Sequence, residues 1–440
     1  MLLLYFILLF YSFFRGIRGC IRTIKSYKYI SNDSTKKIKK AGKKEKTKIK
    51  FHILIPVLRE QKIVIETIKH FLKIKGNYCL YLITTEKEIF EKKNNNRIPK
   101  KYKKLPTTKE IIKNHLKQNP QLLKKIKIIH YPQTVGDMAH QLNYVLKKLN
   151  NVADKNDFVI VYNADSRVKP NILQKYLNII RSEKQCNVVL QSALFLSNYN
   201  KLSNFLKSIA LLQTRWTLAH EIPRVLKTNG KFGFTEGAHV VGHGLCIKYC
   251  FIKKIGGFPQ DFLNEDLPLG YFIRLNGAKI NLLHDLENAD TPTTTNNMFN
   301  MYRTWFYGVM YYPSYIKKAL VNPKFNKLLA ITWGIKYSTR GIFWLFLSLV
   351  WFLIFILPIL ANKLIWLPIS VISFIIYAPL NFWLIYRLFG KKFKINFEWP
   401  PIIWSPATYL THSFGPWLAV TDLVKSKIFK TKVYKYKTER

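Results

Sequence analysis

The sequence predicts a mixed α/β domain with a mostly parallel sheet, joined to helices that enter a membrane. Short apolar runs alternate with helix-like stretches between residues 51 and 190, the pattern of strands connected by crossover helices. A second observation is the run Gly341 to Leu360, twenty residues without a charge, which is long enough to cross a bilayer. Third, 71 Lys and Arg stand against 24 Asp and Glu, a net charge of +47 that favours an anionic neighbour.

Composition excludes two broad classes of protein. The chain has 440 residues, of which 48% are hydrophobic and 15% aromatic, enough to fill a core, so disorder is not the main state. The five cysteines are odd in number and lack a CxxC spacing, which argues against a disulfide framework or a thiolate zinc site. A reducing compartment is the simpler setting.

The apolar segments and the basic stretches predict the membrane topology. We expect an uncleaved anchor helix over 1–20, because the positive charges follow the apolar run and no small-residue cleavage site is present. A transmembrane hairpin is expected over 341–390, preceded by an interfacial segment over 311–340. Residues 391–440 are expected to form an interfacial or re-entrant segment and a basic cytoplasmic tail, because prolines interrupt the apolar stretch there.

Lys and Arg concentrate beside these segments and set the orientation. Residues 21–50 form a basic juxtamembrane linker, and the positive-inside rule places it in the cytoplasm with residues 51–310. The protein is therefore expected to be integral to an inner or plasma membrane, with its α/β domain cytoplasmic. Nucleic acid is not expected as a partner, because the basic linker lacks interleaved aromatic residues and no DNA-binding motif is present.

Acidic residues are scarce, and several follow predicted strands. Glu60 comes after the run that begins at Phe51, and Asp165 follows the run 157–162 next to Asn163. In parallel sheets ligands bind at the carboxyl ends of the strands. Oxygen ligands there suit a divalent cation that also holds a diphosphate, whereas an Asx-turn or a helix cap is the alternative.

Five short motifs occur in the order found in one enzyme family. They are Ile55-Pro56-Val57-Leu58-Arg59-Glu60, Gly136-Asp137-Met138-Ala139-His140-Gln141-Leu142-Asn143, Asn163-Ala164-Asp165-Ser166, Gly242-His243-Gly244, and Gly256-Gly257-Phe258 with Asn264-Glu265-Asp266. From about Phe51 to Gly308 the series resembles the membrane-bound family 2 glycosyltransferases. Their catalytic domain has the GT-A fold, a Rossmann-like nucleotide-diphospho-sugar transferase architecture. The resemblance rests on the order of the motifs, since no single one is specific.

The resemblance implies an inverting, metal-dependent glycosyltransferase of cell-envelope polysaccharide biosynthesis. It makes Asp266 the catalytic base with Glu265 beside it, and it places Asp165 and Asn163 on Mg²⁺ or Mn²⁺. The implied nucleotide-sugar contacts are Pro56, Val57, Glu60, Thr85, Asp137, Asn143 and Ala164. The implied acceptor or phosphate contacts are Gly242, His243, Gly244, Arg303 and Trp305. A UDP-sugar is favoured over a GDP-sugar as donor, and the acceptor is lipid-linked or a glycan; the sequence does not indicate an oligomeric state.

The chain departs from the family pattern at several positions. Asn163 replaces the first Asp of the metal motif, Asp137 stands where Lys is common, and Thr85 lies where an Asp often meets the base. The processive motif QxxRW is altered, because Arg303 and Trp305 are one residue further apart. This favours a single transfer over a processive polysaccharide synthase. A non-catalytic, basic, membrane-tethered binding protein is the alternative from another class. Interfacial anchoring is the alternative role of Arg303 and Trp305, and a hydrogen-bonded loop residue that of His243.

Overall fold

The computed structural model describes residues 1–32, 49–94, 100–183, 185–230, 233–237, 240–431 and 433. The chain divides into two compact units, which are treated separately. The helical unit comprises Met1–Asn32, Ala193–Glu236 and Asn288–Arg440, and the sheet unit comprises Asp33–Ser192 and Gly237–Glu287. Most of the predicted basic linker 21–50, and most of the basic tail after residue 431, lie outside the described residues.

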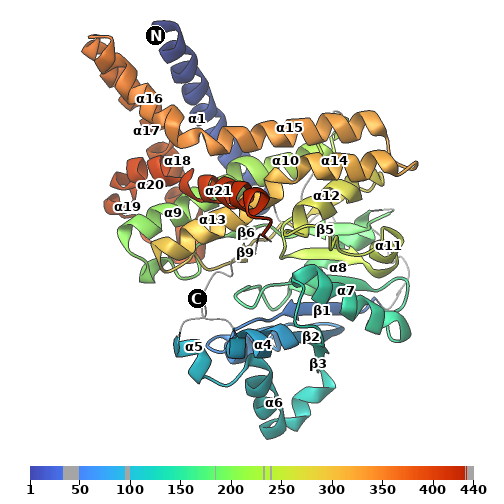
Figure 1. The fold of residues 1–440 in the computed structure, drawn as a ribbon. Coiled ribbons are helices and arrows are strands. Elements are labelled where there is room, and N and C mark those ends of the chain that lie inside the picture. Colours follow the sequence, from blue (N-terminus) through green and yellow to red (C-terminus); the bar gives the residue numbers. More distant parts are fainter. Residues whose placement is uncertain are drawn as a thin grey trace. The chain divides into compact units, whose positions relative to one another are not determined.

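The sheet unit is built on one seven-stranded sheet with the order β3-β2-β1-β4-β7-β5-β8. All neighbouring strands are parallel except β7, which runs antiparallel to β4 and to β5. The strands are β1 (Phe51–Pro56), β2 (Tyr78–Thr85), β3 (Ile126–Tyr131), β4 (Phe158–Val161), β5 (Val188–Leu190), β7 (Leu245–Lys248) and β8 (Ile280–Leu282). A separate two-stranded sheet pairs β6 (Ala193–Leu194) with β9 (Glu287–Asn288). The expected mixed α/β sheet with central parallel strands is confirmed (Figure 1).

Helices cover the strands on both faces, which explains why the central strands are continuous apolar runs. All eight residues of β2 are buried, and so are the first five of β1. The helices and helical turns of this unit are α3 (Val64–Phe71), α4 (Glu86–Asn94), α5 (Lys100–Lys104), α6 (Thr108–Gln118), η1 (Pro120–Lys124), α7 (Met138–Lys148), η2 (Leu149–Asn151), α8 (Ile172–Ser182), α11 (Tyr249–Lys254) and α12 (Asp266–Leu275).

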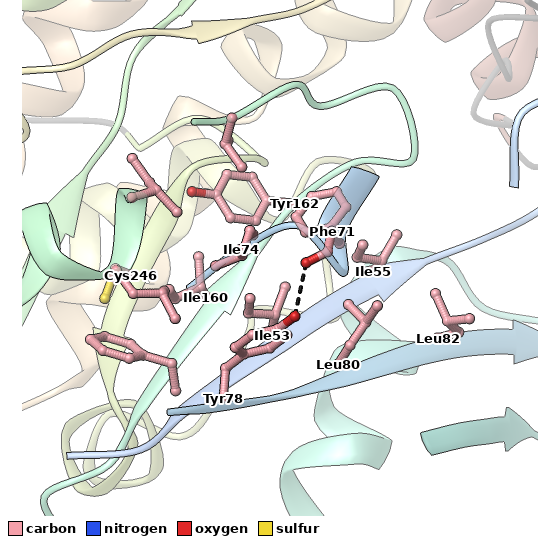
Figure 2. Packing of buried hydrophobic residues seen from close by; sticks show 14 of the residues in the cluster. Ile53, Ile55, Phe71, Ile74, Tyr78, Leu80, Leu82, Ile160, Tyr162 and Cys246 are labelled. Atoms are coloured by element: carbon pink, nitrogen blue, oxygen red, sulfur yellow. Dashed lines mark hydrogen bonds between the residues drawn. The ribbon is translucent and has the colours of Figure 1, made fainter. Parts of the chain in front are cut away.

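The main core of the sheet unit lies between one face of the sheet and helices α3, α6 and α8. Alternate residues of β1, such as Ile53 and Ile55, point to this face and pack against Phe71 of α3 (Figure 2). The hydroxyl of Tyr78 crosses the cluster and donates to the backbone oxygen of Phe71 at 2.9 Å. A buried hydroxyl is thereby satisfied without breaking the apolar packing.

The helical unit consists of long apolar helices and shorter connecting ones. They are α1 (Leu2–Ser31), η3 (Tyr199–Lys201), α9 (Asn204–Trp216), η4 (Thr217–Glu221), α10 (Ile222–Thr228), η5 (Gly233–Thr235), α13 (Thr295–Met310), α14 (Tyr312–Val321), α15 (Lys327–Leu345), α16 (Leu347–Leu360), η6 (Leu364–Trp366), α17 (Leu367–Tyr377), α18 (Pro379–Phe393), α19 (Trp399–Ile403), α20 (Ser405–Thr411) and α21 (Phe414–Ile428). Glycines bring several of these helices into close contact: a Cβ on Gly16 of α1 would lie 2.9 Å from the backbone of Tyr377.

Among the described residues, two helical stretches are long and apolar enough to cross a membrane, Leu2–Ser31 and Leu364–Phe393, and the bent pair α15 and α16 adds a third if it is one span. The N-terminal helix is longer than the predicted anchor over 1–20. The uncharged run Gly341 to Leu360 is not one straight helix, because α15 and α16 meet at 51°. At this bend the Ser413 hydroxyl donates to the Trp344 carbonyl at 2.8 Å and accepts from the Ser348 N–H. Such side-chain bonds satisfy the backbone groups that the bend leaves open.

The stretch 51–310, predicted as one continuous domain, is distributed over both units. Residues 193–236 and 288–310 belong to the helical unit. Helix α9 packs there against α18, α19 and α20. Amphipathic character alone does not say which neighbour a helix covers, so the sequence did not reveal this division.

A buried carboxylate in the sheet unit carries hydrogen bonds from three neighbouring residues. Asp157, which is 2% exposed, accepts hydrogen bonds from the N–H groups of Lys50 and Asp154 and contacts Nε2 of His52, each at 3.0 Å. Asp157→Ala should lower the free energy of unfolding by about 2–4 kcal/mol, because the buried ring of His52 and the N–H groups of Lys50 and Asp154 lose their partner. Denaturant unfolding in neutral detergent measures this effect. The exposed Asp154→Ala in the same turn is the control, and equal stability of both variants would contradict the prediction.

Candidate active site

The carboxyl edge of the sheet gathers the predicted motifs of the sheet unit. The chain proceeds from β1 outward to β2 and β3 and then returns to β4 on the other side of β1. In sheets of this kind, the reversal between β1 and β4 leaves a crevice above their carboxyl ends, where ligands bind. The segments beginning at Pro56 and Asn163 follow these two strands directly. Because β7 is antiparallel, Gly242-His243-Gly244 enters it at the same edge.

The loops after β1 and β2 are held by short hydrogen bonds. Val57 donates its N–H to Ile83 O at 2.9 Å, and the N–H of Glu60 donates to the Thr108 hydroxyl at 2.9 Å. The Thr85 hydroxyl accepts from the N–H of Lys87 at 3.2 Å, and Lys87 Nζ reaches Gly136 O at 3.0 Å. These contacts bring the predicted nucleotide residues after β1, after β2 and before α7 to one edge. Lys87 is a cation at this edge that the sequence reasoning missed.

The turn after β4 carries the predicted metal ligands. Asn163 and Ser166 close it with two bonds of 3.1 Å, from Asn163 N–H to Ser166 Oγ and from Ser166 N–H to Asn163 O. Ala164 O accepts from the Thr67 hydroxyl, and the N–H of Val168 donates to Nε2 of His70 at 2.9 Å. Asp165 is 3% exposed within this turn. Two side chains of α3 therefore position a loop almost a hundred residues further along the chain.

Burial is the main cause of the low pKa of His70, which is lowered from 6.5 to about 4, and the charges of Arg167 and Lys73 lower it further. The ring is thus neutral at pH 7, as its role as acceptor from Val168 requires. No sequence signal marked His70, because the contact depends on how α3 packs on the sheet.

A small pocket lies where β4, α7, the start of β7 and α12 meet. Its polar lining comes from Glu265 and Asp266, and Met138, Leu142 and Val161 are among its apolar residues. Asp266 is the first residue of α12, and its Oδ1 accepts from the N–H of Leu267 at 2.8 Å. The amide groups at a helix start stabilise a negative charge placed there. The two predicted catalytic carboxylates are thus together in this pocket, which Met138 and Leu142 of the second motif and Gly242 of the fourth also line.

The glycines of Gly242-His243-Gly244 allow close approaches. A Cβ on Gly242 would lie 3.3 Å from Glu265 Oε1 and 3.7 Å from Asp266 Oδ2, so this backbone contacts both acids. Gly244 has φ +65°, and a Cβ there would lie 2.3 Å from Gln191 O. A side chain is therefore excluded at Gly244 by conformation and by space. Close packing thus accounts for glycine at positions 242 and 244, and Gly242 lies near the predicted base, Asp266.

Buried polar residues behind this motif were not found from the sequence. His243 Nδ1 lies 3.2 Å from Oε2 of Glu287, which is 1% exposed. The Tyr162 hydroxyl donates to Gln191 Oε1 at 2.7 Å. Burial, with a smaller contribution from Glu287, raises the pKa of Tyr162, so this hydroxyl stays protonated and remains a donor. Gln191 follows a predicted strand, as Asp165 does. This position at a strand end was the feature of the sequence that could have identified it.

Asn143 holds the loop that leads to Glu265 and Asp266, the predicted catalytic acids. Its Nδ2 donates to Phe258 O at 2.7 Å, and its Oδ1 accepts from the N–H of Phe258 at 2.8 Å. A Cβ on Gly257 would lie 2.5 Å from the same Oδ1. Asn143 is therefore a positioning residue for this loop. Asp137 occupies the cap position of α7, where its Oδ1 lies 3.0 Å from Nδ1 of His140.

The residues after β4 fit a cation that is shared with a diphosphate. Within the described ranges, no three His, Cys, Asp or Glu side chains are grouped so that they hold a metal ion by themselves. Asp165 and Asn163 offer hard oxygen ligands, and Mg²⁺ typically takes one or two carboxylates together with phosphate oxygens and water. Asp285 is not available for such a site, because Lys169 and Lys175 contact its oxygens at 2.9 and 2.8 Å. Although its burial opposes this, the two lysines lower the pKa of Asp285.

Arg303 and Trp305 belong to the helical unit, on α13. Arg303 forms a two-nitrogen ion pair with Asp422 of α21, and the Tyr307 hydroxyl donates to the same carboxylate. The ring of Trp305 lies 6.0 Å from those of Phe195 and Tyr302, measured between centroids, and is 36% exposed. Arg303 thus joins α13 to α21, and its predicted contact with phosphate stays a prediction.

Comparison with known proteins identifies the family. The model of the "Glycosyl transferase family group 2" matches residues 158–386, which is more than half of the chain. The chain belongs to this family. It is a glycosyltransferase, and the α/β fold class expected from the sequence is the one found. The predicted resemblance is confirmed.

One solved structure is similar to this family 2 glycosyltransferase at 10% identity and a TM-score of 0.44: the mannosyltransferase PcManGT from Pyrobaculum calidifontis in complex with GDP-Man and Mn²⁺. The alignment covers 84% of the present chain and 98% of that chain. Among curated proteins, no sequence matches.

The contact of His70 with the metal-motif turn predicts a pH dependence. The pKa of His70 is lower in the folded protein, so the unfolded chain binds the proton first as the pH falls. The stabilisation that depends on neutral His70 should be fully present above about pH 6.5 and should decline toward pH 4. His70→Gln retains an acceptor for Val168 and removes the titration, so it should flatten this decline in thermal unfolding. If stability depends on pH in His70→Gln as it does in the unaltered protein, the prediction for His70 is wrong. Burial also lowers the pKa of His52, so His52 contributes to the pH dependence that remains.

Proposed function

We propose that the enzyme is an inverting, metal-dependent glycosyltransferase. It moves a sugar from a nucleotide-sugar donor to a hydroxyl of a lipid-linked or membrane-proximal acceptor at the cytoplasmic face. The observation that carries the proposal is the pocket at the carboxyl edge of the sheet, where Asp266 begins α12 and Glu265 lies beside it against Gly242. Such a pocket offers a carboxylate that is fixed by its backbone and open to a substrate.

In this proposal, the donor site lies at the carboxyl ends of the strands. Pro56, Val57 and Glu60 after β1 and Thr85 after β2 receive the nucleoside, while Ala164 and Asp137 flank the diphosphate. Lys87, which reaches Gly136 O, supplies a positive charge beside this edge. A UDP-sugar is the favoured donor and a GDP-sugar the alternative.

Asp165 and Asn163 would hold Mg²⁺ or Mn²⁺ together with the donor's diphosphate. The bound cation would neutralise the negative charge on the leaving nucleoside diphosphate. The chain itself fixes these ligands through Ser166, Thr67 and His70, so little reorganisation is needed when the donor binds.

Asp266 acts as the base in this proposal. Its carboxylate takes the proton from the acceptor hydroxyl while that oxygen attacks the anomeric carbon and the bond to the diphosphate breaks. One displacement at this carbon inverts its configuration. The helix start favours the ionised carboxylate that the step requires. Glu265, 5% exposed, and the Gly242-His243-Gly244 backbone border the place of the acceptor.

Membrane attachment supports an acceptor that resides in the bilayer. The part of the chain that the structure describes contains two helical stretches long and apolar enough to span a membrane, and a third if the bent pair is one span. The basic segments beside them favour a cytoplasmic location for the catalytic unit. A covalently tethered enzyme meets a lipid-linked hydroxyl at a high local concentration.

A panel of nucleotide sugars tests the reaction class. We expect the detergent-solubilised protein to release the nucleotide from one donor in the presence of Mn²⁺ or Mg²⁺, and EDTA should abolish the release because the diphosphate loses its counter-charge. A single discrete product is expected with a lipid-linked acceptor, and a ladder would favour a processive synthase. Release that persists unchanged in EDTA would contradict metal dependence.

The base assignment is tested by Asp266→Asn. This change keeps the size and removes the proton acceptor, so transfer should fall by about 10²–10⁴-fold. Binding of the donor, measured by calorimetry with Mn²⁺, should remain within a few-fold of the unaltered enzyme. Asp261→Asn, an exposed position in the same loop, serves as the matched control. Full activity of Asp266→Asn would refute its role as base.

A further inference from the structure

Arg215 is a buried charge in the helical unit without a counter-ion. The residue lies on α9 and is 3% exposed. Its Nε and one terminal nitrogen are buried and have no hydrogen-bond partner, and in the described part of the chain no carboxylate forms an ion pair with it. The ring of Tyr377, 4.4 Å from the guanidinium carbon, is its main compensation. An isolated buried charge is costly, and an ionisable residue among membrane helices usually marks a function.

The chain makes space for this guanidinium. Gly19 of α1 faces it, and a Cβ at that position would lie 3.0 Å from the terminal nitrogen. The amide oxygen of Asn381 lies on the same side of Gly19 and makes no hydrogen bond with the guanidinium. The acceptors around Arg215 are thus neutral, and its charge is not cancelled.

Other buried polar atoms without partners lie in an aromatic cluster that begins at Tyr377, the ring that contacts Arg215. They are Nε1 of Trp344, Nε1 of Trp351, the hydroxyl of Tyr409 and Nδ1 of His412. Between ring centroids, Tyr377 lies 4.9 Å from Trp351 and 5.2 Å from Tyr409, Tyr409 lies 6.4 Å from His412, and His412 lies 5.6 Å from Trp344. Buried donors without acceptors are rare in native proteins, and the nitrogens of Arg215 and of the two tryptophans can only donate.

The positive potential at this place acts on His412. Burial, followed by the charges of Arg215 and Arg15, lowers the pKa of His412 to about 3. The ring of His412 is partly exposed. A negatively charged group would relieve both the repulsion and the missing hydrogen bonds.

We propose that Arg215, Trp344, Trp351, Tyr409 and His412 bind the phosphate group of a phosphorylated lipid. A phosphate carries only acceptor oxygens, several of them on one small centre, and the guanidinium fork binds it through two parallel hydrogen bonds. A lipid is the favoured source because the helices that carry these residues expose large apolar side chains, among them Leu349, Phe352 and Leu410. The inference rests on the proposed function in one respect: this lipid phosphate is the anchor group of the acceptor.

The probe is phosphatidic acid, a lipid with a terminal phosphate, added in mixed neutral-detergent micelles to the full chain. We expect saturable binding, seen as a change in tryptophan fluorescence and a rise in the unfolding temperature. Phosphatidylcholine, whose phosphate is masked by a choline group, should give neither effect. Equal effects of the two lipids would overturn the proposal. Inorganic pyrophosphate is the soluble arm, and saturation at the same concentration as phosphatidic acid would overturn the lipid as source.

Variants connect binding to the named residues. Arg215→Gln should weaken binding of phosphatidic acid by about tenfold or more, since a charge-assisted bond is lost. Arg387→Gln, an exposed arginine on α18 in the same unit, should bind normally. Tyr409→Phe removes only a hydroxyl that has no partner, so without lipid the protein should be as stable as before or more stable. With lipid, its affinity should fall severalfold. Unchanged affinity of Tyr409→Phe would overturn the proposal even if Arg215→Gln does not fold.

The two proposals fail separately. Asp266→Asn should lose transfer and still bind phosphatidic acid, which shows that lipid binding does not require catalysis. If Arg215→Gln and Tyr409→Phe both bind this lipid normally, the phosphate site is wrong, and metal-dependent transfer is unaffected. Binding that depends on Arg215, without transfer from any donor, would instead refute the proposed reaction.

Discussion

The parallel pairing of β1 with both β2 and β4 is the constraint on which the rest of the sheet unit depends. Parallel strands require crossovers, and crossovers bury the strands on both faces, so polar side chains are confined to the strand ends. The reversal of direction after β1 brings two of these ends together. The turn with Asp165 and the loop after Pro56 therefore share one edge. The antiparallel β7 adds Gly242 to the same edge, and with it the start of α12.

Loops at this edge are not held by the sheet alone. Side chains from the covering helices reach them: Thr67 and His70 of α3 bind the turn after β4, and Asn143 of α7 binds Phe258. In each contact a side chain of a helix forms a hydrogen bond with a backbone group of the loop. The bond holds the loop in place and satisfies the polar group of the side chain. The predicted catalytic carboxylates, Glu265 and Asp266, are thereby distinct from the residues that hold the loops.

The helical unit combines buried apolar side chains, such as those of Trp351 and Phe382, with contacts of a different kind. Close packing at Gly16 and Gly415, and hydrogen bonds across helices such as those of Ser413, also hold its helices together. In such surroundings Arg215 and the four other buried polar groups without partners are conspicuous. Arg303 shows the contrast, since its charge is matched by Asp422 and its role is to join two helices.

The sequence by itself determined the strands, the apolar helices and the order of the motifs, because local hydrophobic patterns decide burial and strand ends decide where acids can lie. Asp165 was predicted in this way, whereas the roles of Asp266 and Gly242 were predicted from the resemblance to the family. Only the tertiary structure decided that Asn143 and His70 position loops, that residues 193–236 join the helical unit, and that the apolar run beginning at Gly341 bends near Phe346. The physical reason is that each of these depends on a partner distant in sequence, and a residue's own neighbours do not reveal which distant group will complete its hydrogen bonds.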